Sequence, residues 1–257
     1  MQTLASPLEA SGLSWECCAV ALGRAAPGRI STRPKGYPMA ILLDSASLAD
    51  AAAAAELGFV GGITTNPALM ARETGAPLTQ LERLLTAFPA GPLCFQPVGD
   101  TASEMIDQAR AAVALAPQRV VVKLPATLEA LRAATALRAE GCHCALTAVY
   151  APAQALLADE VGCKWIIPYV DRAARQSLGG LVVIDALAAI LTALDSDTRI
   201  LAASLKSSQQ VVDSILHGAH DVTAPLDVLT GLAAHPLTES AVAEFAAAAA
   251  KAQAGAQ

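Results

Sequence analysis

The sequence has few aromatic residues, no excess of positive charge and no long uninterrupted apolar run. Aromatic residues make up 4% of the 257 residues although hydrophobic residues make up 54%, so alanine, leucine and valine must fill the core. The formal net charge of −6 argues against a broad surface for nucleic acid or anionic membranes. Because polar or charged residues interrupt every apolar stretch of about 18 residues, we expect no membrane-spanning helix.

The six cysteines form no recognisable framework of disulfides or zinc ligands. Cys17 and Cys18 are adjacent, Cys142 and Cys144 flank His143, and no CxxC pair occurs. On an alternating strand His143 faces away from both of its cysteine neighbours, so these three residues are not expected to share a metal ion. We therefore predict free thiols in a reducing, cytoplasmic environment and a protein without a metal site.

Residues 1–38 differ in composition from the rest of the chain. They contain four prolines, four basic residues against two acidic ones, and no sustained hydrophobic periodicity. The segment lacks the basic start and apolar stretch of a signal peptide. Met39 stands immediately before the first predicted strand. We therefore expect residues 39–257 to form one domain, preceded by an extension that is disordered or an artefact of start-site assignment.

After Met39, short β-branched or apolar segments alternate with longer stretches rich in alanine and leucine. The predicted strands are 41–43, 60–64, 93–97, 119–123, 142–147, 165–169, 199–203 and 221–224. Helices are predicted between them at 47–56, 102–115, 127–139 and 153–160, with helix ends at Gly58, Gly141, Gly162 and Gly218. Eight such units in about 250 residues favour a single (β/α)8 TIM barrel over an open doubly wound sheet.

The active site of such a barrel lies where the strands meet the loops that follow them. Polar residues at these places are Asp44, Thr64, Thr65, Asn66, Gln96, Lys123, Thr147, Tyr169, Ser204 and Lys206. Lys123 is the most specific candidate for a catalytic residue, because it follows three valines and precedes Leu124 and Pro125. Apolar surroundings remove hydration and favour the neutral amine, which can attack a ketone and form an imine. The alternatives are an ordinary surface lysine or one that holds a phosphate.

Asp44, Thr64 and Asn66 each have a structural and a functional interpretation. Asp44 could move protons at a reacting hydroxyl, or it could cap the next helix in competition with Ser45 or Ser47. Thr64 and Asn66 could bring a hydroxyl and an amide to the mouth of the barrel, or they could belong to a loop-to-helix cap. The residues alone leave these alternatives open.

Tyr169 and three further residues are candidates for contacts with water and with an anionic group. The Tyr169 phenol could orient a water molecule or donate a proton, or its ring could simply pack in the core. Arg172, Ser204 and Lys206 all donate hydrogen bonds and could hold a phosphate. Arg172 and Lys206 could equally be solvated surface charges.

The segments at these strand ends resemble the transaldolase family, and within it the small fructose-6-phosphate aldolase branch. The resemblance covers Met39 to about Phe245 and rests on segments that occur in this order: LLDSAS, GGITTNPAL, VVVKLPAT, LTAVY, IPYVDR, LAASLKS and VTAPLDVL. It implies a barrel with a Schiff-base lysine on the fourth strand, and Lys123 ends the fourth predicted strand. It also implies an enzyme that acts on small sugar phosphates without a metal or organic cofactor, because the lysine is the electron sink.

The resemblance implies catalytic roles for five residues. Lys123 is the nucleophile and Asp44 is the carboxylate that transfers protons and binds a hydroxyl. Gln96 and Thr147 position a catalytic water, and Tyr169 is the third contact of that water and the phenol that transfers protons.

The resemblance also implies how the substrate is held. Thr64 and Asn66 contact its hydroxyl groups, and Arg172, Ser204 and Lys206 form the phosphate end of the site.

Two activities share this scaffold. The aldolase branch releases free dihydroxyacetone, whereas transaldolases pass a dihydroxyacetone unit between sugar phosphates of the pentose phosphate pathway. Typical transaldolases carry Glu, Phe and Arg where this sequence has Gln96, Tyr169 and Lys206. The expected function is therefore class I cleavage or formation of fructose 6-phosphate, with transaldolase activity as the alternative. Two places depart from the aldolase pattern: the segment 97–100 has a different sequence, and Asp171 stands where the aldolase branch has Asn.

More distant alternatives are a non-catalytic barrel that binds sugar phosphates and a Schiff-base aldolase for deoxyribose phosphate. The TTNP and SLK segments argue against the deoxyribose phosphate enzyme. The segment 237–257 is predicted to be a helix, and 247–250 is apolar all round, so this helix is expected to bury both sides. The resemblance implies that it packs on a neighbouring subunit of a ring-shaped homo-oligomer such as a decamer.

Overall fold

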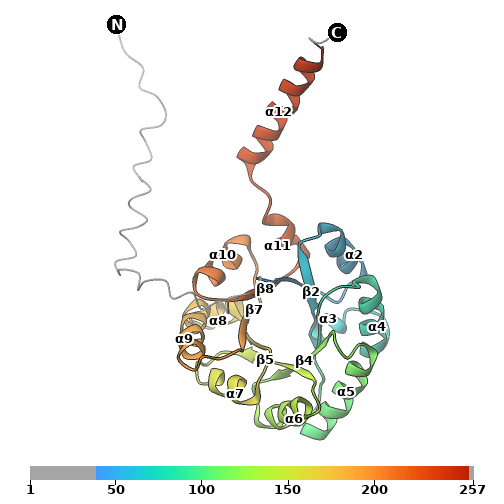
Figure 1. Cartoon of the computed structure of the whole chain (residues 1–257), viewed down its shortest axis with the longest axis vertical. Coiled ribbons are helices and arrows are strands. Elements are labelled where there is room, and N and C mark those ends of the chain that lie inside the picture. Colours follow the sequence, from blue (N-terminus) through green and yellow to red (C-terminus); the bar gives the residue numbers. More distant parts are fainter. Residues whose placement is uncertain (1–38, 255–257) are drawn as a thin grey trace. The chain divides into compact units, whose positions relative to one another are not determined.

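A computed structural model of the protein describes residues 39–254. Eight parallel strands follow one another around a closed barrel, and β8 pairs with β1 to complete the ring. Figure 1 shows the strands on the inside and the helices around them. The (β/α)8 barrel predicted from the sequence is therefore confirmed. The expectations for residues 1–38, including those for Cys17 and Cys18, lie outside the described residues.

The strands are β1 (Ile41–Asp44), β2 (Val60–Thr64), β3 (Leu93–Phe95), β4 (Val120–Pro125), β5 (His143–Val149), β6 (Trp165–Pro168), β7 (Arg199–Ala202) and β8 (Asp221–Ala224). The helices are α2 (Leu48–Leu57), α3 (Pro67–Met70), α4 (Pro77–Ala87), α5 (Ala102–Leu115), α6 (Leu128–Ala139), α7 (Gln154–Val161), α8 (Val170–Arg175), α9 (Gly180–Ala193), α10 (Ser208–Leu216), α11 (Leu226–Gly231) and α12 (Pro236–Ala254). Each predicted strand corresponds to one observed strand, and β2, β8 and α5 have the predicted bounds.

The predicted position of Lys123 at the end of its strand is wrong. β4 continues to Pro125, because Leu124 and Pro125 keep their register with β5, opposite Leu146 and Thr147. Lys123 therefore lies inside the strand rather than in the loop after it. This placement fixes its backbone more firmly than a loop would.

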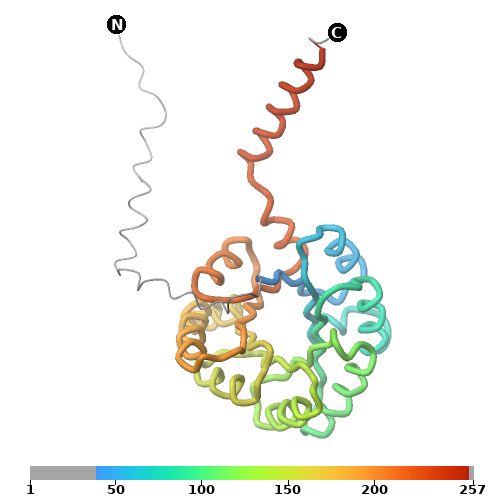
Figure 2. The backbone as a smooth tube through the Cα atoms, in the orientation of Figure 1, coloured from blue at the N-terminus to red at the C-terminus, as the bar shows by residue number. Residues whose placement is uncertain are grey.

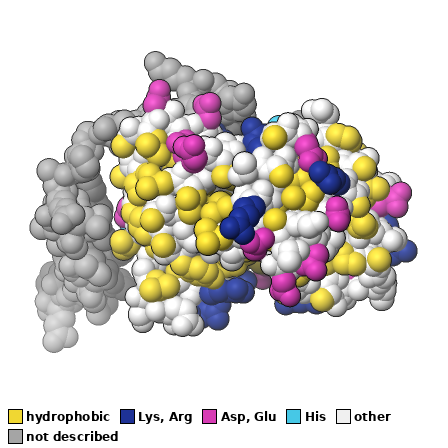
Figure 3. Space-filling view, turned by 90° about the horizontal axis from the view of Figure 1, so that it is seen from below, with side chains coloured by type: hydrophobic (Ala, Val, Ile, Leu, Met, Phe, Trp, Pro, Cys, Tyr) yellow, Lys and Arg dark blue, Asp and Glu magenta, His cyan; other side chains and the backbone are white. Residues whose placement is uncertain are grey.

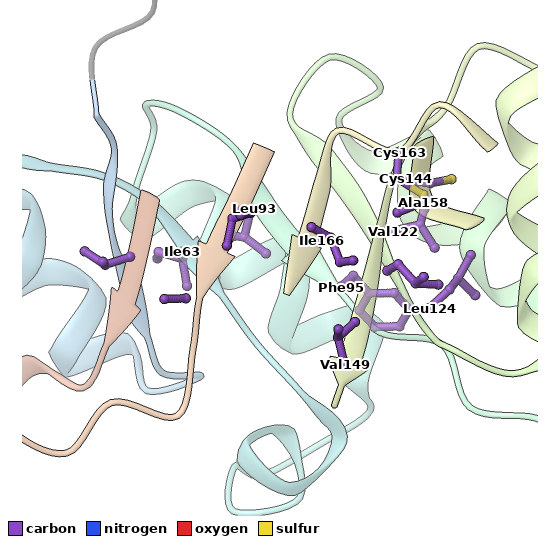
Figure 4. Close-up of a cluster of buried hydrophobic side chains, with 14 of the residues drawn as sticks. Ile63, Leu93, Phe95, Val122, Leu124, Cys144, Val149, Ala158, Cys163 and Ile166 are labelled. Carbon is purple, nitrogen blue, oxygen red and sulfur yellow. The ribbon is translucent and has the colours of Figure 1, made fainter. Parts of the chain in front are cut away.

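The two-residue alternation of the strands divides the buried residues into two cores. One core lies between the barrel and its helices, and Figure 4 shows part of it, with labelled side chains from β2 to β6 and from α7. The other core fills the barrel itself and contains Leu42, Cys94, Val121, Ala145, Trp165, Ile167, Leu201 and Ala203. Lys123 follows Val121 by two residues, so the same alternation directs its side chain into the barrel.

A buried ion pair fills the end of the barrel where the strands begin. Arg199 donates to both carboxylate oxygens of Asp221 at 2.7 Å, and the Asp221 side chain is only 1% exposed. The same carboxylate accepts from the Trp165 indole N–H at 2.9 Å and from the Ala40 backbone N–H at 2.8 Å. Asp221 thus ties β6, β7 and β8 to the residue before β1.

Helix α12 contributes no side chain to the core, so the expectation that it buries both sides is not met within one chain. Figure 2 shows that the helix leaves the barrel instead of lying along it. Leu237 and Phe245 are 74% and 71% exposed. Hydrophobic side chains also touch one another on the barrel face shown in Figure 3, between scattered charged groups. Among the helices of residues 39–254, none combines the length and the hydrophobicity that a membrane span requires.

We predict that Asp221→Ala lowers the free energy of unfolding by about 3–5 kcal/mol, because it leaves the Arg199 guanidinium buried without its partner. Denaturant unfolding at a fixed protein concentration measures the change. Asp107→Ala is the matched control, since it removes an exposed ion pair with Arg110, and it should change stability little. Equal losses in the two variants would contradict the importance of the buried pair.

Candidate active site

A pocket of about 540 Å³ opens at the end of the barrel where the strands finish. Eight of the ten residues predicted for the site line it: Asp44, Asn66, Gln96, Lys123, Tyr169, Arg172, Ser204 and Lys206. The other two, Thr64 and Thr147, are fully buried just behind the lining. The structure therefore brings together residues that are scattered over most of the sequence.

Lys123 is the buried amine of this pocket. Its side chain is 2% exposed, and Nζ donates to the Thr65 carbonyl oxygen at 3.0 Å. None of the ion pairs within residues 39–254 includes Lys123. The alternative interpretation of Lys123 as a surface lysine is wrong. The hydrogen bond to Thr65 holds the amine at the floor of the pocket, where a substrate carbonyl can reach it.

Asp44 lies at the end of β1 and faces the same pocket. Its Oδ1 accepts from the Thr64 hydroxyl at 2.9 Å. The cap of α2 is Ser47, whose hydroxyl accepts from the Asp50 backbone N–H. Because Ser47 fills the capping role, the structural alternative for Asp44 is wrong, and its carboxylate stays available to a ligand.

Asn66 has the capping function that was one of its two alternatives. Its side-chain oxygen accepts from the Leu69 backbone N–H at 3.0 Å and so begins α3, with Pro67 in the first turn. Asn66 also lines the pocket. Its amide nitrogen has no role in the cap and is the part of the side chain that can donate to a ligand.

Gln96 follows β3, Thr147 lies on β5 and Tyr169 follows β6. The Thr147 hydroxyl donates to the Tyr169 hydroxyl at 3.4 Å. The Gln96 Oε1 is buried and accepts no hydrogen bond from residues 39–254. A buried acceptor of this kind favours a donor from water or from a substrate. The ring of Tyr150 packs edge-on against Tyr169, with centroids 6.0 Å apart.

Cationic and hydroxyl groups from the β6 and β7 ends form the outer rim. Arg172 and Lys206 are exposed, and the Arg172 guanidinium lies 5.1 Å from the centre of the Tyr169 ring. Asp171 pairs with Arg175 at 2.8 Å and not with Arg172. Ser204 has a φ of 60°, a left-handed conformation that is uncommon for serine. The rim therefore presents two cations with no carboxylate partner among the described residues.

Sequence reasoning missed several residues of the pocket. Ser45, Asp50, Arg72, Ala148 and Pro225 also line it. Arg72 follows the end of α3 and sits opposite the β6 rim in strand order, but no strand-end rule identifies a residue beyond a short helix. Ala148 has a φ of 55° at a bulge in β5, which the sequence does not signal. No group of three or more metal-binding side chains occurs within the described part of the chain.

Cys94 lies in the barrel interior below the pocket, where burial suppresses the reactivity of its thiol. Burial outweighs the opposing effect of the nearby Lys123 charge and raises the pKa of the Cys94 thiol to about 11. Burial likewise raises the pKa of Cys144 to about 12 and that of Cys163 to about 11. These thiols stay protonated at neutral pH, whereas the thiolate is the reactive form.

We predict that iodoacetamide at mildly alkaline pH leaves Cys94, Cys144 and Cys163 unmodified in the folded protein. The raised pKa values keep the thiolate fraction far below that of an ordinary cysteine, and burial blocks access. Peptide mass spectrometry after a timed reaction measures this, with the denaturant-unfolded protein as the positive control. Modification of Cys94 at the same rate in both samples would contradict its placement.

Comparisons with known proteins agree with this geometry. The family model described as Transaldolase/Fructose-6-phosphate aldolase matches residues 41–257. A probable transaldolase of Maridesulfovibrio salexigens is 37% identical over 207 residues, which cover 80% of this chain and 96% of that protein. A probable transaldolase of Symbiobacterium thermophilum is 35% identical over 207 residues, covering 80% and 95%.

Among solved structures, a mandelate oxidase variant with an FMN adduct is similar in fold. The TM-score is 0.52 at 16% sequence identity, and the match covers 74% of this chain and 64% of that chain. At this identity the similarity concerns the barrel architecture alone.

Proposed function

Because the chain belongs to the transaldolase/fructose-6-phosphate aldolase family, we propose that it cleaves and forms fructose 6-phosphate as a Schiff-base aldolase with Lys123 as nucleophile. The family makes it an enzyme of the Schiff-base aldolase and transaldolase type. The products of cleavage are dihydroxyacetone and glyceraldehyde 3-phosphate. No metal or organic cofactor is needed, because the protonated imine accepts the electrons of the broken bond.

The observation that carries this proposal is a buried lysine amine among hydroxyl and carboxylate groups at the strand ends of a barrel. The Lys123 side chain is 2% exposed and shares its pocket with Asp44, Gln96 and Tyr169. Nucleophile, proton acceptor and water contacts thus face one cavity. The cations Arg172 and Lys206 stand at its rim and suit the phosphate of the substrate.

In the first half of the reaction the neutral Lys123 amine attacks carbon 2 of fructose 6-phosphate. The carbinolamine loses water to give the protonated imine, with proton transfer assisted by a water held between Gln96, Thr147 and Tyr169. Asp44 then accepts the proton of the hydroxyl on carbon 4. The bond between carbons 3 and 4 breaks, its electron pair moves into the imine, and glyceraldehyde 3-phosphate leaves.

In the second half the remaining enamine takes a proton on its carbon from Tyr169 through the held water, which restores the imine. Water adds to that imine, the carbon–nitrogen bond breaks, and dihydroxyacetone leaves the free Lys123 amine. Gln96 cannot ionise, and Tyr169 adds a hydroxyl that holds water. Both properties favour hydrolysis of the imine over its retention for a second sugar.

Transaldolase activity is the second candidate, since the relatives carry the name probable transaldolase. The two activities share every step up to the enamine. They differ in the step after the enamine. The aldolase releases dihydroxyacetone by hydrolysis, whereas the transaldolase transfers the dihydroxyacetone unit to a second aldose phosphate. Gln96 and Tyr169 support the aldolase, and they are the residues on which the choice depends.

We propose in addition that the protein is a cytoplasmic homo-oligomer in which α12 packs on a neighbouring copy, as in a decamer. The exposed apolar residues Leu237, Val242 and Phe245 of α12 support this arrangement.

We predict that Lys123→Met abolishes covalent trapping of dihydroxyacetone by borohydride. Without the amine no imine forms, so neither the mass increase nor cleavage of fructose 6-phosphate should be detected. Intact-protein and peptide mass spectrometry measure the adduct and its position. Lys164→Met is the matched control, because Lys164 packs over the Trp165 ring away from the pocket, and it should trap like the wild type. An adduct that persists in Lys123→Met would refute the assignment.

We predict that Tyr169→Phe lowers the release of glyceraldehyde 3-phosphate from fructose 6-phosphate by about 10²-fold, the range for loss of a proton-transfer group. The fraction of enzyme trapped by borohydride at equilibrium should stay high, because the held water changes the rate of imine formation and not the amount of imine present at equilibrium. Steady-state release and trapping are measured on the same preparation. A variant with wild-type release would show that the phenol has no part in proton transfer.

A further inference from the structure

Thr223 on β8 contacts Thr64, one of the proposed site residues, although Thr223 itself does not line the pocket. Its side chain is fully buried, and its hydroxyl lies 2.7 Å from the Thr64 hydroxyl. Thr64 in turn donates to Asp44 Oδ1 at 2.9 Å. Three side chains therefore form one continuous hydrogen-bonded chain that ends on the proposed proton acceptor.

The topology explains why these residues meet. β1, which carries Asp44, pairs with β2 on one side and with β8 on the other, and the Thr64 hydroxyl on β2 reaches both Asp44 and Thr223 inside the barrel. Asp44 is directly opposite Thr64, whereas Thr223 is opposite Leu42, two residues below Asp44. Thr223 therefore supports the chain from beneath the carboxylate, inside the barrel and away from bulk water.

Counting protons fixes the direction of the hydrogen bonds. A threonine hydroxyl has one proton to donate and can accept through its lone pairs. The proton of Thr64 goes to Asp44, so Thr223 must be the donor in the bond between the two hydroxyls. Donation to Thr64 makes Thr64 a better donor to the carboxylate, because hydrogen bonds in a chain polarise one another.

The chain also distinguishes the two oxygens of Asp44. Oδ1 accepts from Thr64, and no hydrogen bond from residues 39–254 reaches Oδ2. Oδ2 is therefore the oxygen of Asp44 that remains available to a ligand in the pocket that this residue lines. Without Thr223, the buried Thr64 hydroxyl lacks its donor and is free to rotate, so the carboxylate is no longer held in one orientation.

We propose that Thr223 is a positioning residue for carbon–carbon cleavage, acting through Thr64 to hold Asp44 in the orientation that accepts the carbon 4 hydroxyl proton. This role rests on the proposed aldolase function. Thr223 does not touch the substrate, and imine formation at Lys123 does not depend on it. Cleavage and imine formation should therefore respond differently when the Thr223 hydroxyl is removed.

The experiment compares wild type with Thr223→Val, Thr223→Ser, Thr64→Val and the Thr64→Val/Thr223→Val double variant. Release of glyceraldehyde 3-phosphate reports cleavage, and borohydride trapping of dihydroxyacetone reports imine formation. Thr198→Val is the control for losing a buried threonine hydroxyl elsewhere: Thr198 donates to the Cys163 carbonyl oxygen at 2.8 Å, at the other end of the barrel.

We expect kcat for cleavage to fall by about tenfold in Thr223→Val, the effect of one lost hydrogen bond on the transition state. Its KM and its trapping should stay close to those of the wild type, and Thr223→Ser should restore cleavage because it restores the hydroxyl. The double variant should be no slower than Thr64→Val, since both changes break the same chain. Thr198→Val should cleave like the wild type.

Three results would overturn the role of Thr223: wild-type cleavage in Thr223→Val, no recovery in Thr223→Ser, or additive losses in the double variant. A loss of trapping equal to the loss of cleavage would also overturn it, because it would indicate general damage to the barrel. A wild-type protein that neither traps dihydroxyacetone nor releases the aldehyde would instead overturn the proposed function, and this role with it.

Discussion

Closure of eight parallel strands into one ring directs every second side chain into a narrow interior, and the rest of the structure depends on this constraint. Along β4 the inward positions are Val121 and Lys123, and along β8 they are Asp221 and Thr223. A strand thus contributes a core residue or an anchoring charge at one end and a polar side chain at or next to the pocket at the other. The two side chains are only two residues apart along the strand, which is one step of the alternation between inward and outward positions.

The interior is consequently divided along the barrel axis. Asp221 and Arg199 neutralise each other where the strands begin, apolar residues such as Leu42 and Ile167 fill the middle, and polar groups gather where the strands end. The apolar middle removes water from beneath Lys123. It makes each hydrogen bond at the pocket floor more directional and more costly to leave unpaired, which suits chemistry that depends on a fixed amine and a fixed carboxylate.

The barrel and most of the pocket were predictable from the sequence, because strand periodicity locates strand ends and parallel topology brings those ends together. Lys123 was placed on the correct strand, but continued pairing with β5 moves it inside the strand, and local sequence does not report how far pairing extends. The residues alone left open whether Asn66 caps a helix or lines the site, and the structure shows that it does both. Thr223 escaped prediction because its contact is with Thr64 on another strand, and Arg72 because it lies beyond a short helix and not at a strand end. The apolar pattern of α12 predicted burial that one chain does not provide.

The most direct test of this account is the turnover of fructose 6-phosphate with no acceptor sugar present, followed through free glyceraldehyde 3-phosphate. Steady release that does not depend on added erythrose 4-phosphate is expected if Gln96, Thr147 and Tyr169 bring water to an imine on Lys123. Release that appears only when erythrose 4-phosphate is added would contradict the proposed aldolase function. It would indicate a transaldolase whose covalent intermediate is retained until a second sugar reacts with it.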